Sequence, residues 1–170
     1  MNSMNNIKED ISKRFENVIF EEVSKQQLSV DMKKDNIHSA LAYLKSSGWD
    51  QLTFLTCVDW IEIKKFQLVY VLMNWDEGIT INLRTEIDRD NPIMDSIISI
   101  FPGAEYYERD VHEFFGVNFP GNPNYEKDLF LEIWDDMPPM RKDFDPLAYS
   151  KRKFPDREYK AEFIPEGDEL

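Results

Sequence analysis

Ionisable side chains crowd one stretch in the second half of the 170-residue chain. Glu105, Arg109 and Glu113 follow one another at four-residue steps, as do Glu108 and His112. On a helix, such steps place side chains on one face, where acids and bases form ion pairs or, with a histidine, hold a metal ion. Ion pairs that are solvated or lie in an interface are the usual result of this charge pattern, so we prefer them to a carboxylate–histidine metal site.

Other chemistry-bearing residues are sparse. A single cysteine and two histidines, His38 and His112, are too few for a Cys-rich zinc or iron–sulfur site. Cys57 falls inside an apolar, strand-like run, where we expect a buried and unreactive thiol. The six glycines have no spacing that would cradle a phosphate.

Paired acids leave one catalytic alternative. Asp135 with Asp136, or Asp59 with Glu62, would suit a stand-alone carboxylate-dependent hydrolase. A chain with 33 Asp and Glu residues contains such pairs by chance, and the carboxylate separation that this chemistry needs is not set by sequence. We therefore predict no catalytic residue and keep the hydrolase as a remote alternative.

A helix must position the charged stretch. Tyr107, Val111, Phe114 and Phe115 recur at three- and four-residue spacing, which is an apolar stripe of helical period. Gly116 follows where a left-handed C-terminal cap would end that helix.

The preceding sequence predicts a mixed set of elements. We expect helices at residues 7–15 (capped by Asn5 or Asn6), 34–47 and 92–100 (opened by Asn91 and Pro92), and strands at 18–23, 27–30, 52–60, 66–74 and 79–86. Residues 75–78, Trp-Asp-Glu-Gly, predict a hairpin between the last two strands. Helices mixed with consecutive hairpin-like strands predict an α+β fold of two layers, with helices packed on a mostly antiparallel sheet.

The prolines predict a division of the chain. Seven of the nine lie from Pro120 onward, which separates a domain at residues 1–117 from an extended C-terminal tail at residues 118–170. The tail combines basic residues at 141–142 and 151–153 with five spaced aromatic residues: Phe144, Tyr149, Phe154, Tyr159 and Phe163. Exposed rings would leave apolar patches in water, so we predict that the tail wraps a partner.

Composition excludes several classes of protein. A net charge of -13 argues against binding nucleic acid and against direct docking on an anionic membrane. The longest apolar runs are strand-sized, short of the roughly 20 residues that span a bilayer, and the N-terminal residues lack the apolar core of a signal peptide. A single cysteine is typical of a reducing compartment. We expect a cytosolic protein, or one attached to a membrane only through partners.

An ordered series of motifs resembles a known family. The motifs are Glu108-Arg109-Asp110, Glu113-Phe114-Phe115-Gly116, Gly121-Asn122-Pro123, a Leu-rich step from Leu129 to Trp134, Pro139-Met140-Arg141-Lys142-Asp143-Phe144 and, upstream, the strand-like run Leu52–Trp60. Together they resemble the signature of the C subunit of respiratory complex I (the NADH dehydrogenase) and of the equivalent subunit of membrane-bound, energy-converting nickel–iron hydrogenases. The chain departs from that signature at Asp110, where glutamate is usual, at Asn122, where histidine is usual, and at Glu126 and Asp128.

The resemblance implies a cofactor-free scaffold subunit in the peripheral arm of an ion-translocating oxidoreductase, at the cytoplasmic face of a membrane. Its partners would be a large hydrogenase-like or quinone-site subunit and a small iron–sulfur subunit, which would carry the nickel–iron and iron–sulfur centres; the membrane arm would be reached indirectly. The motif residues would serve structure or subunit interfaces: Glu108, Arg109, Asp110, Glu113, Phe115, Gly116, Trp134, Arg141, Lys142, Asp143 and Phe144.

The branch within the family is a separate prediction. The residues of the motif at 108–116 favour the hydrogenase and archaeal relatives. The alternatives are a subunit of an NADH- or F(420)H(2)-type quinone or phenazine dehydrogenase and, more remotely, an unrelated adaptor.

Overall fold

The computed structural model describes residues 3–157. In chain order the elements are α1 (Ser3–Arg14), β1 (Ile19–Ser24), β2 (Gln27–Asp31), the 3-10 turn η1 (Lys34–Asn36), α2 (Ile37–Ser46), β3 (Gln51–Trp60), the 3-10 turn η2 (Ile61–Ile63), β4 (Lys65–Asn74), β5 (Ile79–Asp88), α3 (Ala104–Phe115) and α4 (Pro146–Lys153). None of the helices in this described range is both long and apolar enough to cross a bilayer.

The five strands form one sheet in the order β1-β2-β5-β4-β3. Only β2 and β5 run parallel; the other three neighbouring pairs are antiparallel. β4 and β5 pair without a shift from Lys65 opposite Asp88 to Asn74 opposite Ile79, which confirms the predicted hairpin. The α+β fold on a mostly antiparallel sheet is confirmed as well.

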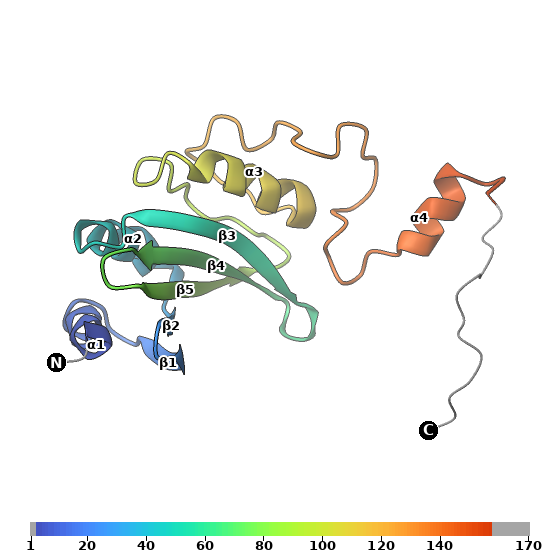
Figure 1. The fold of residues 1–170 in the computed structure, drawn as a ribbon. Coiled ribbons are helices and arrows are strands. Elements are labelled where there is room, and N and C mark those ends of the chain that lie inside the picture. Colours follow the sequence, from blue (N-terminus) through green and yellow to red (C-terminus); the bar gives the residue numbers. More distant parts are fainter. Residues whose placement is uncertain (1–2, 158–170) are drawn as a thin grey trace, which may run out of the picture.

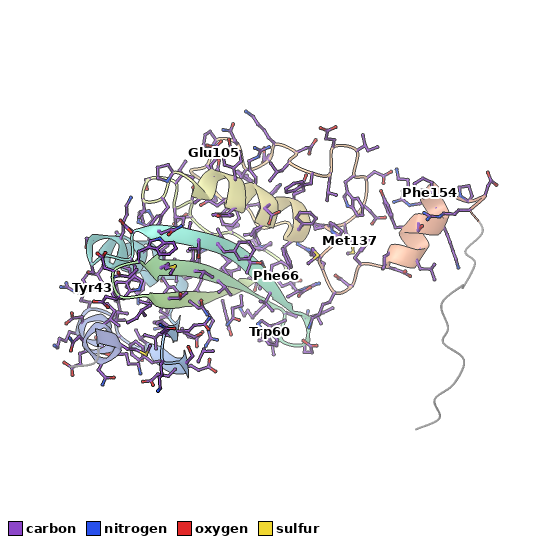
Figure 2. All side chains as sticks on the ribbon, viewed as in Figure 1. Tyr43, Trp60, Phe66, Glu105, Met137 and Phe154 are labelled. Carbon is purple, nitrogen blue, oxygen red and sulfur yellow. The ribbon has the colours of Figure 1, made fainter. Side chains whose placement is uncertain are left out.

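The core lies against one face of this sheet. Along β4 burial alternates with the period of two that a one-sided strand shows: Phe66, Leu68, Tyr70 and Leu72 are fully buried, and the residues between them are half-buried. Figure 1 shows α3 lying along this face, and Figure 2 places Phe66 between the sheet and the C-terminal end of α3. There its ring meets Phe115 edge to face, with the ring centroids 6.0 Å apart.

The predicted helix at residues 92–100 is wrong. The segment is extended or turned, and from Pro92 to Ser96 every second residue is buried, as in a strand. Its backbone amides are bonded outside the segment: the Met94 amide donates to the Asn118 carbonyl (2.9 Å) and the Ser96 amide to the Pro120 carbonyl (2.9 Å). A helix would need those amides for its own i to i−4 bonds, so tertiary pairing overrides the helix-compatible isoleucine pattern.

The other helices agree with the sequence, with shifted ends. α1 begins at Ser3, so Asn5 and Asn6 lie inside the helix and do not cap it. The helix predicted at 34–47 is split into η1 and α2. α3 ends as predicted, because Gly116 adopts φ 79°, the left-handed conformation that glycine reaches without strain.

After Gly116 the chain doubles back along α3. This return segment, residues 117–144, has no helix or strand of its own (Figure 1). Val117 and Phe119 are fully buried in the same core as the sheet. The segment leads to α4, which stands away from the sheet (Figure 1) and is capped by the Asp145 carboxylate, which accepts from the amides of Leu147 and Ala148. Tyr159 and Phe163, predicted as part of a partner-wrapping tail, lie outside the described residues.

Candidate functional site

The acids and bases of α3 do not pair with one another as their spacing predicts. Among the described residues, no ion pair joins Arg109 to Glu105 or to Glu113. The Glu105 carboxylate instead accepts from the Asn124 side-chain amide (2.6 Å), and the His112 ring bonds the Val117 carbonyl (2.8 Å). The polar face of α3 is therefore directed at the return segment.

Arg109 and Glu113 hold the backbone of that segment. Arg109 donates from Nε to the Lys127 carbonyl (3.1 Å) and from Nη2 to the Asp128 carbonyl (2.6 Å). One turn further on, the Glu113 carboxylate accepts the three successive amides of residues 129–131 at 2.8–3.1 Å. Arg109 binds backbone carbonyls and Glu113 binds backbone amides. Together the two side chains satisfy the backbone of a segment that forms no helix or strand.

Glu108 is fully buried on the core side of the same helix. Its carboxylate accepts from the Ser96 hydroxyl (2.7 Å), the Ile97 amide (2.8 Å) and the Asn122 side-chain amide (2.9 Å). Burial raises the pKa of Glu108, against the opposing effect of these three donors. One side chain thus ties α3 to residues 96–97 and to the start of the return segment.

An ion-pair network anchors the far end of the segment to the sheet. The Arg89 guanidinium, after β5, donates to both oxygens of Asp59 at the end of β3 (2.8 and 2.9 Å) and to both oxygens of Asp143 (2.6 and 3.3 Å). Asp59 also accepts the Lys142 amide at 2.9 Å. Burial opposes ionisation of Asp59, but the bonds from Arg89 and Lys142 outweigh it and hold the pKa of Asp59 below its usual value. The Arg89 bonds likewise lower the pKa of Asp143.

Arg141 closes the turn after α3. Its Nε donates to the Phe115 carbonyl at 2.8 Å, one of the carbonyls that a helix end leaves free. The space beside Gly116 is filled by this arginine: a methyl group there would lie 3.0 Å from Nη2 of Arg141 and 3.2 Å from Cγ of Pro138.

An aromatic cluster follows where the segment leaves the domain. The Trp134 ring stacks on Tyr149 of α4 at 4.3 Å between centroids, and Phe144 lies 5.4 Å from Trp134. Arg152 of α4 donates to the carboxylates of Asp135 (3.2 Å) and Asp136 (2.6 Å). The return segment and α4 therefore form a joined arm.

We call Glu108, Arg109, Glu113, Asp59, Arg89 and Arg141 the clamp. The predicted motif residues Glu108, Arg109, Glu113, Gly116, Arg141, Lys142 and Asp143 all lie in it or touch it, Phe115 lies in the core behind it, and Trp134 and Phe144 lie in the arm. Asp110 is the exception: it is half-buried on α3, and its carboxylate forms no hydrogen bond or ion pair with any residue that the structure describes.

Sequence reasoning missed Arg89, Ser96 and the pairing of Asp59 with Arg89. The sequence did indicate a role for Asp59, since it lies inside the apolar run Leu52–Trp60, where an acid needs a partner, but nothing in the spacing identifies Arg89 as that partner.

The side chains of the clamp hold the return segment in place, and the other groups considered for chemistry are paired or buried. The acids considered above for hydrolysis are bound by bases: Asp59 by Arg89, and Asp135 and Asp136 by Arg152. Cys57 is buried, as predicted, and burial raises the pKa of its thiol. Within residues 3–157, no group of three or more His, Cys, Asp or Glu side chains is arranged to hold a metal ion.

Comparison with protein families gives one matching model. Residues 30–150 match the family described as "Respiratory-chain NADH dehydrogenase, 30 Kd subunit". The matched range contains every motif on which the resemblance was based, and the resemblance is thereby confirmed.

Curated relatives and solved structures agree with this family match. The chain is 27% identical to the C subunit of NADH-quinone oxidoreductase from Roseobacter denitrificans over 91% of this chain and 78% of that protein. It is 30% identical to the C subunit of F(420)H(2) dehydrogenase from Methanosarcina mazei over 66% of this chain and 72% of that protein. Among solved structures, it is similar to a chain of the membrane-bound sulfane sulfur reductase, an archaeal respiratory membrane complex, at 33% identity and a TM-score of 0.83 over 95% of this chain and 99% of that one. A trypsin-resistant fragment of Nqo5, at 22% identity and a TM-score of 0.62, shares the fold.

Proposed function

The chain belongs to the family of the 30-kDa subunit of respiratory-chain NADH dehydrogenase, and from this we propose that it is a non-catalytic subunit of a complex I-like, membrane-bound respiratory complex. The observation that carries the proposal is the arm. The clamp orders a long irregular segment, and the arm nevertheless leaves large apolar side chains more than half exposed: Phe130, Ile133 and Met140 in the segment, Leu147 in α4 and Phe154 directly after α4. An ordered segment whose apolar side chains are exposed to solvent is suited to burial against another protein.

The neighbours follow from the family resemblance. We propose that the chain braces a large subunit of the hydrogenase-like or quinone-site type and a small iron–sulfur subunit, and that these partners carry the redox centres. In this proposal residues 1–117 form the domain and the tail, residues 118–170, wraps the partners, although the first residues of the tail, through Asn122, also pack into the domain. The chain would lie peripherally at the cytoplasmic face and reach the membrane arm through its partners.

The branch of the family is a finer proposal. The 33% identity to the sulfane sulfur reductase chain extends over 99% of that chain, whereas the 27% identity to the bacterial C subunit extends over 78% of that protein. This difference favours an assembly of the archaeal respiratory type, in which we include the energy-converting hydrogenases, over a bacterial NADH dehydrogenase. The electron donor and acceptor would be decided by the partners.

The test is a tagged purification from the native organism in mild detergent, with the co-purifying proteins identified by mass spectrometry. We expect a large subunit of hydrogenase or quinone-site type, a small iron–sulfur subunit and membrane subunits resembling antiporters, and the remaining proteins would separate hydrogenase, sulfur reductase and dehydrogenase. Recovery of the chain alone, or only with proteins unrelated to respiration, would refute the proposal in favour of an adaptor. Hydrolytic activity of the isolated chain, lost on a single Asp or Glu substitution, would also refute it.

A further inference from the structure

α3 has three faces, and two of them are occupied by the sheet and by the return segment. At about 100° per residue, Ala104, Glu108, Val111 and Phe115 share the face that is buried against the sheet. Glu105, Arg109, His112 and Glu113 share the face that bonds the return segment. The third face consists of Tyr106, Tyr107, Asp110 and Phe114.

This third face is mostly aromatic and is only partly covered, since Tyr107, Asp110 and Phe114 are half-buried. Tyr106 is 60% exposed. The Tyr107 ring meets the half-exposed Phe54 of the edge strand β3 edge to face, at 5.9 Å, and its hydroxyl donates to the Thr53 carbonyl. At the other end of the face, the Phe114 ring lies 6.2 Å from Phe130 of the return segment, which is 65% exposed. Aromatic rings thus continue from β3 across α3 to the arm.

Asp110 lies in the middle of these rings, and no basic side chain among residues 3–157 forms an ion pair with it. It is three residues from Tyr107 and four from Tyr106 and Phe114, so all three side chains are its neighbours on the helix. The nearest base in sequence, Arg109, donates to the carbonyls of the return segment, and its guanidinium lies over the Tyr106 ring at 5.8 Å from the centroid; it forms no ion pair with Asp110. Burial, and then the charge of Glu113, raise the pKa of Asp110. A half-buried carboxylate among rings is unfavourable in the free chain and becomes favourable when a cation is supplied.

We propose that Tyr106, Tyr107, Asp110, Phe114, Phe54 and Phe130 form a docking surface for a segment of a neighbouring subunit that places one lysine or arginine side chain on Asp110 and apolar side chains on the surrounding rings. Charge complementarity selects this occupant: the centre of the surface is anionic and unpaired within the described residues, and the chain as a whole carries a net charge of -13. The same charge disfavours the phosphates of nucleic acid or lipid. The rings would surround the ion pair and exclude water from it, as in the centre of a protein interface.

This inference rests on the proposed function, because it assumes neighbouring subunits. It specifies the surface that contacts one of these subunits and the ion pair that would form there. The experiment compares four tagged full-length chains expressed in the native organism: wild type, Asp110→Asn, Asp110→Lys and Glu16→Lys. Glu16 is an exposed acid between α1 and β1, beside the opposite edge of the sheet, and its substitution makes the same charge change as Asp110→Lys. The readouts are the recovery of partner subunits and the urea midpoint of each isolated chain.

We expect Asp110→Lys to reduce the recovery of partner subunits by at least roughly tenfold and Asp110→Asn by severalfold, while Glu16→Lys behaves as wild type. The urea midpoint of the isolated Asp110→Asn chain should equal or exceed that of wild type, because the variant removes an unpaired, half-buried charge. In addition, a photo-crosslinking residue at position 106 should link to a partner peptide that contains lysine or arginine.

Two results would overturn the inference alone: undiminished recovery with Asp110→Lys, or a lowered urea midpoint of Asp110→Asn that accounts for its loss of recovery. In both, the wild-type chain still recovers respiratory subunits, so the proposed function stands. A wild-type chain that recovers no such subunits would overturn both proposals together.

Discussion

Replacing Arg89 by methionine isolates the part of the clamp that joins the return segment to the sheet. The variant keeps an unbranched apolar side chain in place of the arginine stem and removes the four guanidinium bonds to Asp59 and Asp143. Asp59 is only 3% exposed, so its charge would remain in the interior with a single donor, the Lys142 amide. Asp143 is more exposed and can turn to water.

The expected loss of unfolding free energy at neutral pH is about 3–5 kcal/mol, the range for removing one partner of a buried ion pair. That is a large share of the roughly 5–15 kcal/mol available to a domain. The matched control is the double variant Asp59→Leu with Arg89→Met. It removes both charges, so its loss should be smaller than that of Arg89→Met alone, even though the Lys142 amide then lacks its acceptor.

The difference in unfolding free energy between wild type and Arg89→Met should depend on pH, and this dependence provides a second test of the same reasoning. In wild type the pKa of Asp59 is lowered, so its contribution to stability is present above the unfolded value near 4 and is lost as pH falls through the folded pKa. Without Arg89, burial dominates and the pKa of Asp59 should lie above the unfolded value. The variant should then be most deficient at neutral pH and approach wild type on acidification. Urea unfolding at pH 4–8 measures both effects. A loss below about 1 kcal/mol, or a difference that does not change with pH, would refute the assignment of Arg89 and Asp59 as a buried, mutually dependent pair.

Substitutions at three further positions test the rest of the clamp and the turn beside it. Gly116→Ala should destabilise the chain by at least about 1–2 kcal/mol, because a left-handed residue acquires a Cβ and Arg141 must move; an unchanged urea midpoint would contradict this. For Glu108→Gln, the stability advantage of wild type should shrink as pH rises from about 4 through the folded pKa of Glu108. The raised pKa means that folding opposes ionisation there, so an advantage that grows with pH would reverse the sign of the argument. Arg109→Ala should speed amide hydrogen exchange at residues 129–131 and reduce recovery of partner subunits, with about 1–3 kcal/mol or less lost globally. Arg109→Lys, which cannot bond two carbonyls as a fork, should be intermediate, and wild-type exchange in both variants would exclude Arg109 from the clamp.

Local patterns predicted the elements that carry their own periodicity. The stripe of Tyr107, Val111 and Phe115 identified α3, and the Trp-Asp-Glu-Gly turn identified the β4–β5 hairpin. At residues 92–100 the isoleucines suit a helix or a buried extended segment equally well, and the choice was made by distant carbonyls at Asn118 and Pro120. Sequence spacing does not reveal such partners, so the prediction failed where the structure is decided by tertiary hydrogen bonds.

The same difference explains the charged motif. Four-residue spacing correctly placed Arg109 and Glu113 on one face of α3, but pairing them with each other assumed that the nearest opposite charge is the partner. Exposed helical ion pairs are worth only a few tenths of a kcal/mol, whereas the unpaired amides and carbonyls of an ordered irregular segment would each cost more if left unsatisfied. The side chains therefore bond the return segment.

A segment that has no helix, strand or core of its own can be ordered only if other residues satisfy its backbone. The start, the middle and the end of the return segment are each held by different side chains. Glu108 holds the start through Asn122, Arg109 and Glu113 hold the middle, and the Arg89 pair holds the end. Because side chains of the domain supply these bonds, the exposed apolar side chains of the segment, Phe130, Ile133 and Met140, are not needed to order it and are available to a partner. Weakening the bonds that Arg109 and Glu113 make to the middle of the segment should therefore impair assembly before it unfolds the domain, whereas weakening the core should impair both together. Arg109→Ala compared with a core variant such as Leu68→Ala, each measured by partner recovery and by urea unfolding, separates these two effects.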